Sequence, residues 1–196
     1  TNAVDLNCET PDNLYNNNCI GDKDTLALQE HIPAFDAANI IRANDHLLYL
    51  VSNSGNRAGA ELLQKTLGHD VKVCLLEGVY SYMHIDSTVA FLREGLMLLN
   101  PSRITTKEQL PAPFCDWEAI WCPEPFDIGH YPSYCNASIW INMNLFSVNE
   151  NLVVLEENQH SLRKELEKYR IDCAMLPMRH QRTLGGGFHC VTLDIE

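Results

Sequence analysis

Short blocks of apolar residues recur from residue 35 onward, and each block has the spacing of a particular element. The first group predicts strands at 35–41 and 46–51, a helix at 56–67 and a strand at 71–76. The helix is expected because Ala60, Leu63 and Leu67 share one face, and Gly68 ends it. The order is strand, strand, helix, strand.

The same order recurs further along the chain. The second group predicts strands at 84–92 and 96–99 and a short helix at 106–110. The third group predicts strands at 138–144 and 152–155, a helix at 161–169 and a strand at 173–176, and a last strand at 187–195 begins a fourth group. Repeats of about 50 residues indicate an α/β array in which each unit packs on its neighbours.

The ends of the chain differ from this repeating region. Residues 1–32 are polar and rich in Asn and Asp, so we expect a linker or the end of a preceding module. The chain starts without Met and ends directly after a predicted strand. We therefore expect a fragment of a longer protein, truncated at both ends. A mature chain trimmed at both ends is the alternative.

Charge narrows the range of partners. The chain carries 14 Lys plus Arg against 26 Asp plus Glu, a net charge of -12. This balance argues against binding to nucleic acid or to an anionic membrane surface, because both need a basic patch. No apolar run approaches the length of a membrane span. A cationic small substrate is compatible with the charge.

Eight cysteines require an explanation, and none of them forms a C-x-x-C pair. Zinc ribbons and fingers need closely spaced ligand pairs, so we expect no metal site. The predicted core is large enough to fold without disulfides, and no signal peptide is visible. We therefore expect free thiols and a cytoplasmic location, with disulfides in a secreted protein as the alternative.

One segment stands out as a candidate reactive site. Two residues separate the glycines Gly185, Gly186 and Gly187 from Cys190. Consecutive glycines indicate unusual backbone angles or close approach of a ligand. A cysteine placed directly after such a loop is a candidate nucleophile, and a small buried cysteine is the alternative. No Lys-Ser/Thr pair follows the glycines, which excludes a P-loop.

Two further places carry ionisable groups. On the predicted strand 84–92, His84 and Asp86 point to the same face, which suits proton transfer and cation binding. Asp36 lies among apolar residues at the start of another predicted strand. The alternatives are a surface His–Asp pair and a turn carboxylate. A thiol, a histidine and two carboxylates together suit the chemistry of a planar, cationic guanidinium group.

Three motifs then carry a resemblance. They are Arg-His-Gln-Arg-Thr-Leu-Gly-Gly-Gly-Phe-His-Cys at 179–190, Met-His-Ile-Asp-Ser-Thr at 83–88 and Phe-Asp-Ala-Ala at 35–38, with Asn-Pro-Ser-Arg at 100–103 in its expected place. In their order along the chain these motifs resemble the amidinotransferase family over residues 33–196, which would be the catalytic region. The resemblance extends to glycine amidinotransferase and to bacterial enzymes that act on inosamine phosphates or in cyanotoxin pathways (cylindrospermopsin, saxitoxin).

The resemblance implies a pentein fold, a propeller of five ββαβ modules, of which this chain would hold about the last three. It also implies roles for seven residues. These are Cys190 as nucleophile, His84 as general acid and base, Asp36 as its orienting partner, Asp86 for the guanidinium, Arg103 for the arginine α-carboxylate, and Met83 and Ser138 near the substrates.

The implied reaction moves the amidino group of L-arginine to a primary amine through an amidino-cysteine, releasing L-ornithine without a cofactor. The partners are L-arginine and an amine acceptor, either glycine or an amine of toxin or aminocyclitol metabolism. A homodimer is left open. The alternatives are a guanidine hydrolase similar to arginine deiminase, which would use water as acceptor, and an inactive interaction module.

Overall fold

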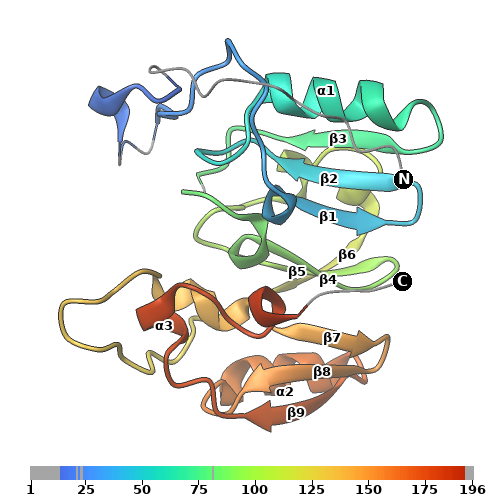
Figure 1. Ribbon diagram of the computed structural model, residues 1–196. Coiled ribbons are helices and arrows are strands. Elements are labelled where there is room, and N and C mark those ends of the chain that lie inside the picture. Colours follow the sequence, from blue (N-terminus) through green and yellow to red (C-terminus); the bar gives the residue numbers. More distant parts are fainter. Residues whose placement is uncertain (1–13, 21, 23, 81, 193–196) are drawn as a thin grey trace.

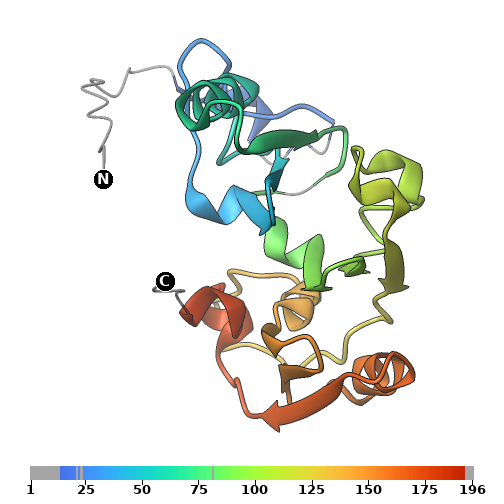
Figure 2. The same cartoon turned by 90° about the vertical axis from the view of Figure 1, so that its right-hand side faces the viewer.

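The computed structural model describes residues 14–20, 22, 24–80 and 82–192 of the chain. Three sheets of three strands follow one another within this part. In each sheet the first strand pairs antiparallel with the second, which pairs parallel with the third. The sheets stack in chain order (Figure 1) and follow an arc when seen from the side (Figure 2). The predicted α/β array of repeated modules is confirmed.

The modules have the following elements. The first holds β1 (Ile40–Ala43), β2 (His46–Leu50), α1 (Arg57–Leu67) and β3 (Lys72–Leu76). The second holds β4 (Val89–Arg93), β5 (Leu96–Leu99) and β6 (Glu118–Trp121). The third holds β7 (Phe146–Asn149), β8 (Leu152–Glu156), α2 (His160–Lys168) and β9 (Asp172–Leu176), and the short helix α3 (Gln181–Leu184) follows.

Helix α1 forms where the sequence predicts it. The side chain of Asn56 accepts a hydrogen bond from the backbone N of Gly59 at 2.8 Å, which caps the first turn. The buried side of α1 packs Ala60 and Leu63 on Tyr49 of β2. The first module is therefore a sheet covered by an amphipathic helix.

The second module has no α-helix between β5 and β6, a stretch that is described throughout. Two 3-10 turns replace it, Lys107–Gln109 and Phe114–Asp116. Phe91, Phe114 and Trp117 pack together there, with ring centroids 4.7 to 5.4 Å apart. These rings supply the apolar cover that a helix supplies in the other two modules.

The central strand β5 joins the two main cores. Met97 and Leu99 pack toward the first module, whereas Leu96 and Leu98 pack toward the third. All four side chains are buried because successive residues of a strand point to opposite faces. Strand β4 lies against both β1 and β7, so the first strands of the modules meet on the inner side of the arc.

Four predicted strands differ from the structure. The first residues of the strands predicted at 35–41 and 84–92 form the 3-10 turns Ala37–Asn39 and Ile85–Ser87, and β1 and β4 start later. The segment predicted as a strand at 138–144 is the 3-10 turn Ile139–Met143, and the true strand is β7. The described part of 187–195 holds the 3-10 turn His189–Val191, while 193–196 lie outside the described residues.

The region before the first module is tied to it. The backbone of Tyr15 pairs with that of Leu28, and the side chain of Asn53 accepts hydrogen bonds from the backbone N atoms of Ala27 and Leu28. Ala27 and Leu28 are buried as a result. Over the described stretches of the chain, every helix is too short or too polar to cross a bilayer.

Candidate active site

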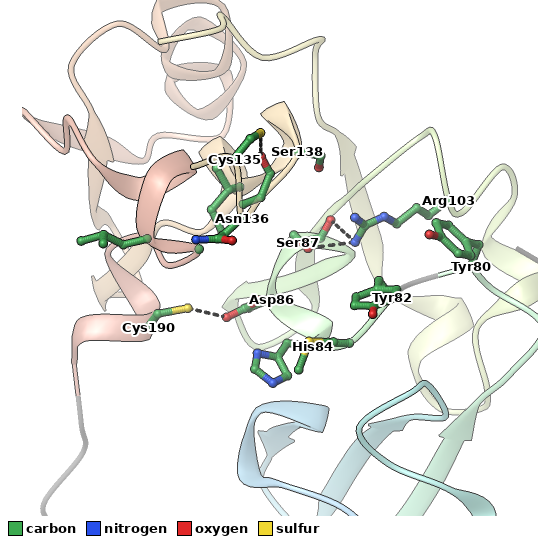
Figure 3. A pocket seen from close by; sticks show the side chains of 15 residues that line it. Tyr80, Tyr82, His84, Asp86, Ser87, Arg103, Cys135, Asn136, Ser138 and Cys190 are labelled. Carbon is green, nitrogen blue, oxygen red and sulfur yellow. Dashed lines mark hydrogen bonds between the residues drawn. The ribbon is translucent and has the colours of Figure 1, made fainter. Parts of the chain in front are cut away.

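A cavity of about 600 Å³ lies between the second and third modules, and Figure 3 shows the side chains around it. Six of the seven predicted site residues line this cavity: Met83, His84, Asp86, Arg103, Ser138 and Cys190. The seventh, Asp36, contacts His84 from the first module. Residues that are distant in sequence are therefore brought to one place.

Cys190 faces Asp86 across this cavity (Figure 3). Its Sγ donates a hydrogen bond to Asp86 Oδ2 over 3.1 Å. Asn144, which the sequence reasoning missed, holds the cysteine at two points: Nδ2 donates to Sγ at 3.2 Å, and Oδ1 accepts from the Cys190 backbone N at 3.3 Å. Asn144 is buried, so it anchors an otherwise exposed residue to the third module.

The three glycines before Cys190 each have a separate structural reason. Gly185 has a φ of +83° and ends α3 in the left-handed conformation, which favours glycine. A Cβ on Gly186 would lie 3.1 Å from Cys190 Cβ, and a Cβ on Gly187 would lie 2.8 Å from the carbonyl oxygen of Asn144. The backbone at Gly186 and Gly187 therefore lies close to Cys190 and Asn144, which belong to the site itself.

The environment of Cys190 favours its neutral thiol. Loss of hydration and the adjacent Asp86 carboxylate raise the pKa of Cys190 to about 11. Burial of Asp86 acts to raise its own pKa, but hydrogen bonds from His189 and Cys190 outweigh burial and lower it. The site at rest therefore holds a carboxylate beside a protonated thiol.

His84 is paired with Asp36. His84 Nε2 lies 3.1 Å from Asp36 Oδ2, and both side chains are partly exposed. His84 precedes the 3-10 turn Ile85–Ser87, so the prediction that His84 and Asp86 share one face of a strand is wrong. The turn nevertheless brings both side chains to the cavity.

Arg103 approaches from the far wall of the cavity. Its Nη1 donates hydrogen bonds to Ser87 Oγ at 2.8 Å and to Thr88 Oγ1 at 2.7 Å. Burial lowers the pKa of Arg103, and the nearby groups of Tyr80 and Asp86 oppose this change. Arg103 is the guanidinium that an anionic group in the cavity would meet.

The remaining lining residues are less enclosed. Ser138 and Met83 are exposed at the cavity rim. Tyr80 and Tyr82 also line the cavity and were not predicted, because tyrosines four and two residues before His84 carry no distinctive spacing. His189 was missed as well: its Nδ1 lies 3.5 Å from Asp86 Oδ2. Its signal was adjacency to Cys190.

Metal-binding groups were also sought. No cluster of three or more His, Cys, Asp or Glu side chains suited to a metal ion occurs among the described residues. The seven cysteines within those residues are free thiols, and Cys8 lies outside them.

Comparison with known proteins identifies homologues of this chain. No protein-family model matches the chain. Inosamine-phosphate amidinotransferase 1 of Streptomyces glaucescens is 47% identical over 164 residues, which are 84% of this chain and 47% of that protein. The chain is homologous to the amidinotransferases. The resemblance expected from its three motifs is thereby confirmed.

Solved amidinotransferase structures agree with the fold. The inosamine-phosphate amidinotransferase of Streptomyces griseus superposes with a TM-score of 0.83 at 45% identity, over 87% of this chain and 49% of that one. An amidinotransferase of the saxitoxin pathway from Microseira wollei gives 0.85 at 26% identity, over 94% and 52%. The pentein-type architecture is confirmed. This amidinotransferase homologue spans about half the length of the proteins it matches.

Proposed function

We propose that this chain carries the nucleophile of an enzyme that transfers the amidino group of L-arginine to a primary amine and releases L-ornithine. The observation that carries the proposal is the pairing of Cys190 Sγ with Asp86 Oδ2 at 3.1 Å, inside a cavity also lined by His84 and Arg103. A thiol and a carboxylate so arranged can meet one guanidinium: the carboxylate holds its N–H groups while sulfur reaches its carbon.

The bound substrate would itself activate the thiol. Asp86 and partial burial hold the pKa of Cys190 at about 11, so little thiolate exists near neutral pH. A guanidinium that pairs with Asp86 neutralises the charge opposing ionisation and takes over its hydrogen bond with sulfur. The pKa of Cys190 then falls when substrate is in place, and the thiol proton passes to the imidazole of His84, which carries it into the first half-reaction. This arrangement restricts the reactive thiolate to the complex with a cationic ligand.

In the first half-reaction the Cys190 thiolate attacks the guanidine carbon, and the C–N bond to the ornithine nitrogen breaks. His84 supplies the proton that this nitrogen needs in order to leave, and Asp36 orients the imidazole. The product is an amidino-cysteine. In the second half-reaction His84 accepts a proton from the acceptor amine, which attacks the same carbon and releases the thiolate.

The other lining residues fit supporting roles. Arg103, which lines the cavity, would bind the α-carboxylate of arginine, since a guanidinium and a carboxylate pair through two parallel hydrogen bonds. Ser138 and Met83 at the rim would contact the substrates as they enter. Because Met83 is exposed beside His84, its size would limit the acceptor. Cytoplasmic location and a homodimer stay predictions.

The acceptor separates the candidate reactions. Glycine and an aminocyclitol or toxin-pathway amine are both kept, since proteins named for inosamine phosphate, glycine and saxitoxin biosynthesis all match this chain in sequence or in structure. A guanidine hydrolase similar to arginine deiminase would use the same cysteine and would release citrulline and ammonia, with water as acceptor.

The test is to incubate the protein with L-arginine alone and with a panel of amines, and to measure ornithine, citrulline and the amidino product. Transfer predicts ornithine that depends on the amine, with an equal amount of amidino product. Formation of citrulline without ornithine would contradict amidino transfer and would show that the enzyme is a guanidine hydrolase. Because the chain matches about half of each relative, the longest natural chain containing this sequence is assayed beside the 196 residues.

A further inference from the structure

Asp86 separates two cavities. One is the candidate active site, and the other, of about 200 Å³, lies among the inner strands β1, β4 and β7. Asp86 lines both cavities, whereas Cys190 lines the first and His189 lines the second. Adjacent residues of one motif therefore reach the same carboxylate from opposite sides.

Both contacts use the same oxygen. Asp86 Oδ2 accepts from Cys190 Sγ at 3.1 Å and lies 3.5 Å from His189 Nδ1. Asp86 is 7% exposed, so water screens these interactions only weakly. His189 is about half exposed through the second cavity, which lets it exchange protons with solvent without passing the substrate.

We propose that His189 is a positioning residue that sets the reactivity of Cys190 through Asp86. When protonated, its imidazolium pairs with Asp86 Oδ2 and offsets the negative charge that opposes thiolate formation. When neutral, it offsets much less. In the empty site, the reactivity of Cys190 then depends on pH in two ways: through ionisation of the thiol itself and through the charge of His189.

The other charged groups near His189 do not give this response. Among the described residues that line the second cavity, Arg42 is the remaining charged one, and a guanidinium does not lose its proton in proteins. Asp86 stays ionised because its pKa is lowered. Histidine titrates between about pH 5 and 8. His84 lines the first cavity and is a second imidazole near Cys190, so the experiment removes its contribution.

The experiment measures alkylation of Cys190 by iodoacetamide between pH 5 and 10, with no substrate present. Trypsin cleaves after Arg182, and the peptide that starts at Thr183 contains Cys190 as its only cysteine, so mass spectrometry reports this thiol alone. His84→Gln serves as the background. In it, the rate should rise less than tenfold per pH unit while His189 titrates, and about tenfold per unit above that range.

Adding His189→Gln to this background should make the rise uniform. The double variant should react about threefold to tenfold more slowly near pH 5.5 and at the same rate near pH 9. If His189 acted only through packing, its replacement would change the alkylation rate of Cys190 at pH 9 as well as at pH 5.5. A uniform rise in the background itself, or a shallow region that survives His189→Gln, overturns the proposal.

Two controls keep the result interpretable. Protection of the buried Cys122 thiol shows that each variant is folded, and His189→Phe replaces His189→Gln if protection is lost. His69→Gln changes an exposed histidine of the first module and should leave the profile unchanged. The inference builds on the proposed function in naming Cys190 as the relevant thiol. Alkylation needs no arginine, however, so a failed transferase assay would leave its outcome intact.

Discussion

The two sides of the cavity are built differently. We call residues 83–103 of the second module the charged wall and residues 183–190 the glycine loop. In the charged wall Asp86, Thr88 and Asn100 are buried, and Asn100 Nδ2 and Arg103 Nη1 both donate to the carbonyl oxygen of Ser87. In the glycine loop Leu184 and Cys190 are exposed.

The glycine loop is attached at its start, where Asn136 Nδ2 donates to the Thr183 carbonyl oxygen at 2.7 Å, and at its end by Asn144. Asn144 contacts Cys190 twice through its side chain, and its carbonyl oxygen accepts from the Phe188 backbone N at 3.0 Å. Groups that must keep their charges fixed in space thus lie on the buried side, where packing restrains them. The attacking sulfur lies on the exposed side, where Asn144 holds Cys190 at its backbone and at its side chain.

The largest effect is expected from removing the attacking atom of the glycine loop. Cys190→Ala should abolish ornithine formation while arginine still binds, because the charged wall is untouched. Ornithine release and calorimetric titration with arginine measure the two properties. Cys135→Ala, another exposed cysteine lining the cavity, is the matched control and should retain turnover. Wild-type ornithine formation by Cys190→Ala would remove the nucleophile from this loop.

The next effect concerns the charged wall. Asp86→Asn should weaken arginine binding and turnover by about 3–5 kcal/mol, the usual cost of removing one partner from a buried charge pair. The same change should make Cys190 react faster with iodoacetamide, because the carboxylate that raises the pKa of this thiol is gone. Slower alkylation, or unchanged arginine affinity, would contradict the coupling between the two sides.

Loosening the loop without touching the wall should have an intermediate effect. Gly187→Ala puts a Cβ 2.8 Å from the Asn144 carbonyl oxygen, so we expect about 1–3 kcal/mol of destabilisation together with lower turnover. Gly59→Ala is the matched control, since its Cβ would lie 2.6 Å from the Ala34 carbonyl oxygen in the first module. Thermal unfolding should be affected in both variants, and Cys190 alkylation only in Gly187→Ala.

The smallest effect is expected at the exposed pair. Asp36→Asn should lower the free energy of unfolding by about 0.2–1 kcal/mol, the usual range for exposed ion pairs. It should also reduce turnover, because His84 loses the partner that orients its imidazole. Asp45→Asn breaks a similar exposed pair with His46 outside the cavity. Equal turnover in Asp36→Asn and Asp45→Asn would show that Asp36 has no part in the site.

The sequence predicted the modules better than the turns between them. Helices α1 and α2 carry apolar residues on one face, and their strands are apolar blocks, so burial alone identifies them. The segment 138–144 misled the prediction because Ile139, Ile141 and Met143 alternate as in a strand. There the side chain of Asn142 donates to the carbonyl oxygens of Ile139 and Phe126, which favours a 3-10 turn.

The candidate site was predicted largely through its motifs. Six of the seven residues line the cavity although the strand argument for His84 and Asp86 was wrong, because a 3-10 turn also presents both. Asn144 could not be found in this way. It lies 46 residues before Cys190 within an apolar run, and its role comes from packing of the third module alone.

Strand β5 carries apolar residues on both faces, so burial of apolar groups does not by itself fix the register in which β5 pairs with its neighbours. A slip by one residue would exchange Leu96 and Leu98 with Met97 and Leu99, and either pairing would bury apolar groups on both faces. The tight turn at Gly95, with a φ of +77°, and the register shift between Phe91 and Arg93 must therefore choose between them. A slip would carry Arg103 about 3.4 Å along the strand, away from Ser87 and Thr88. The turn at Gly95, which lies in the β4–β5 hairpin, therefore helps to set the position of Arg103 in the far wall of the cavity.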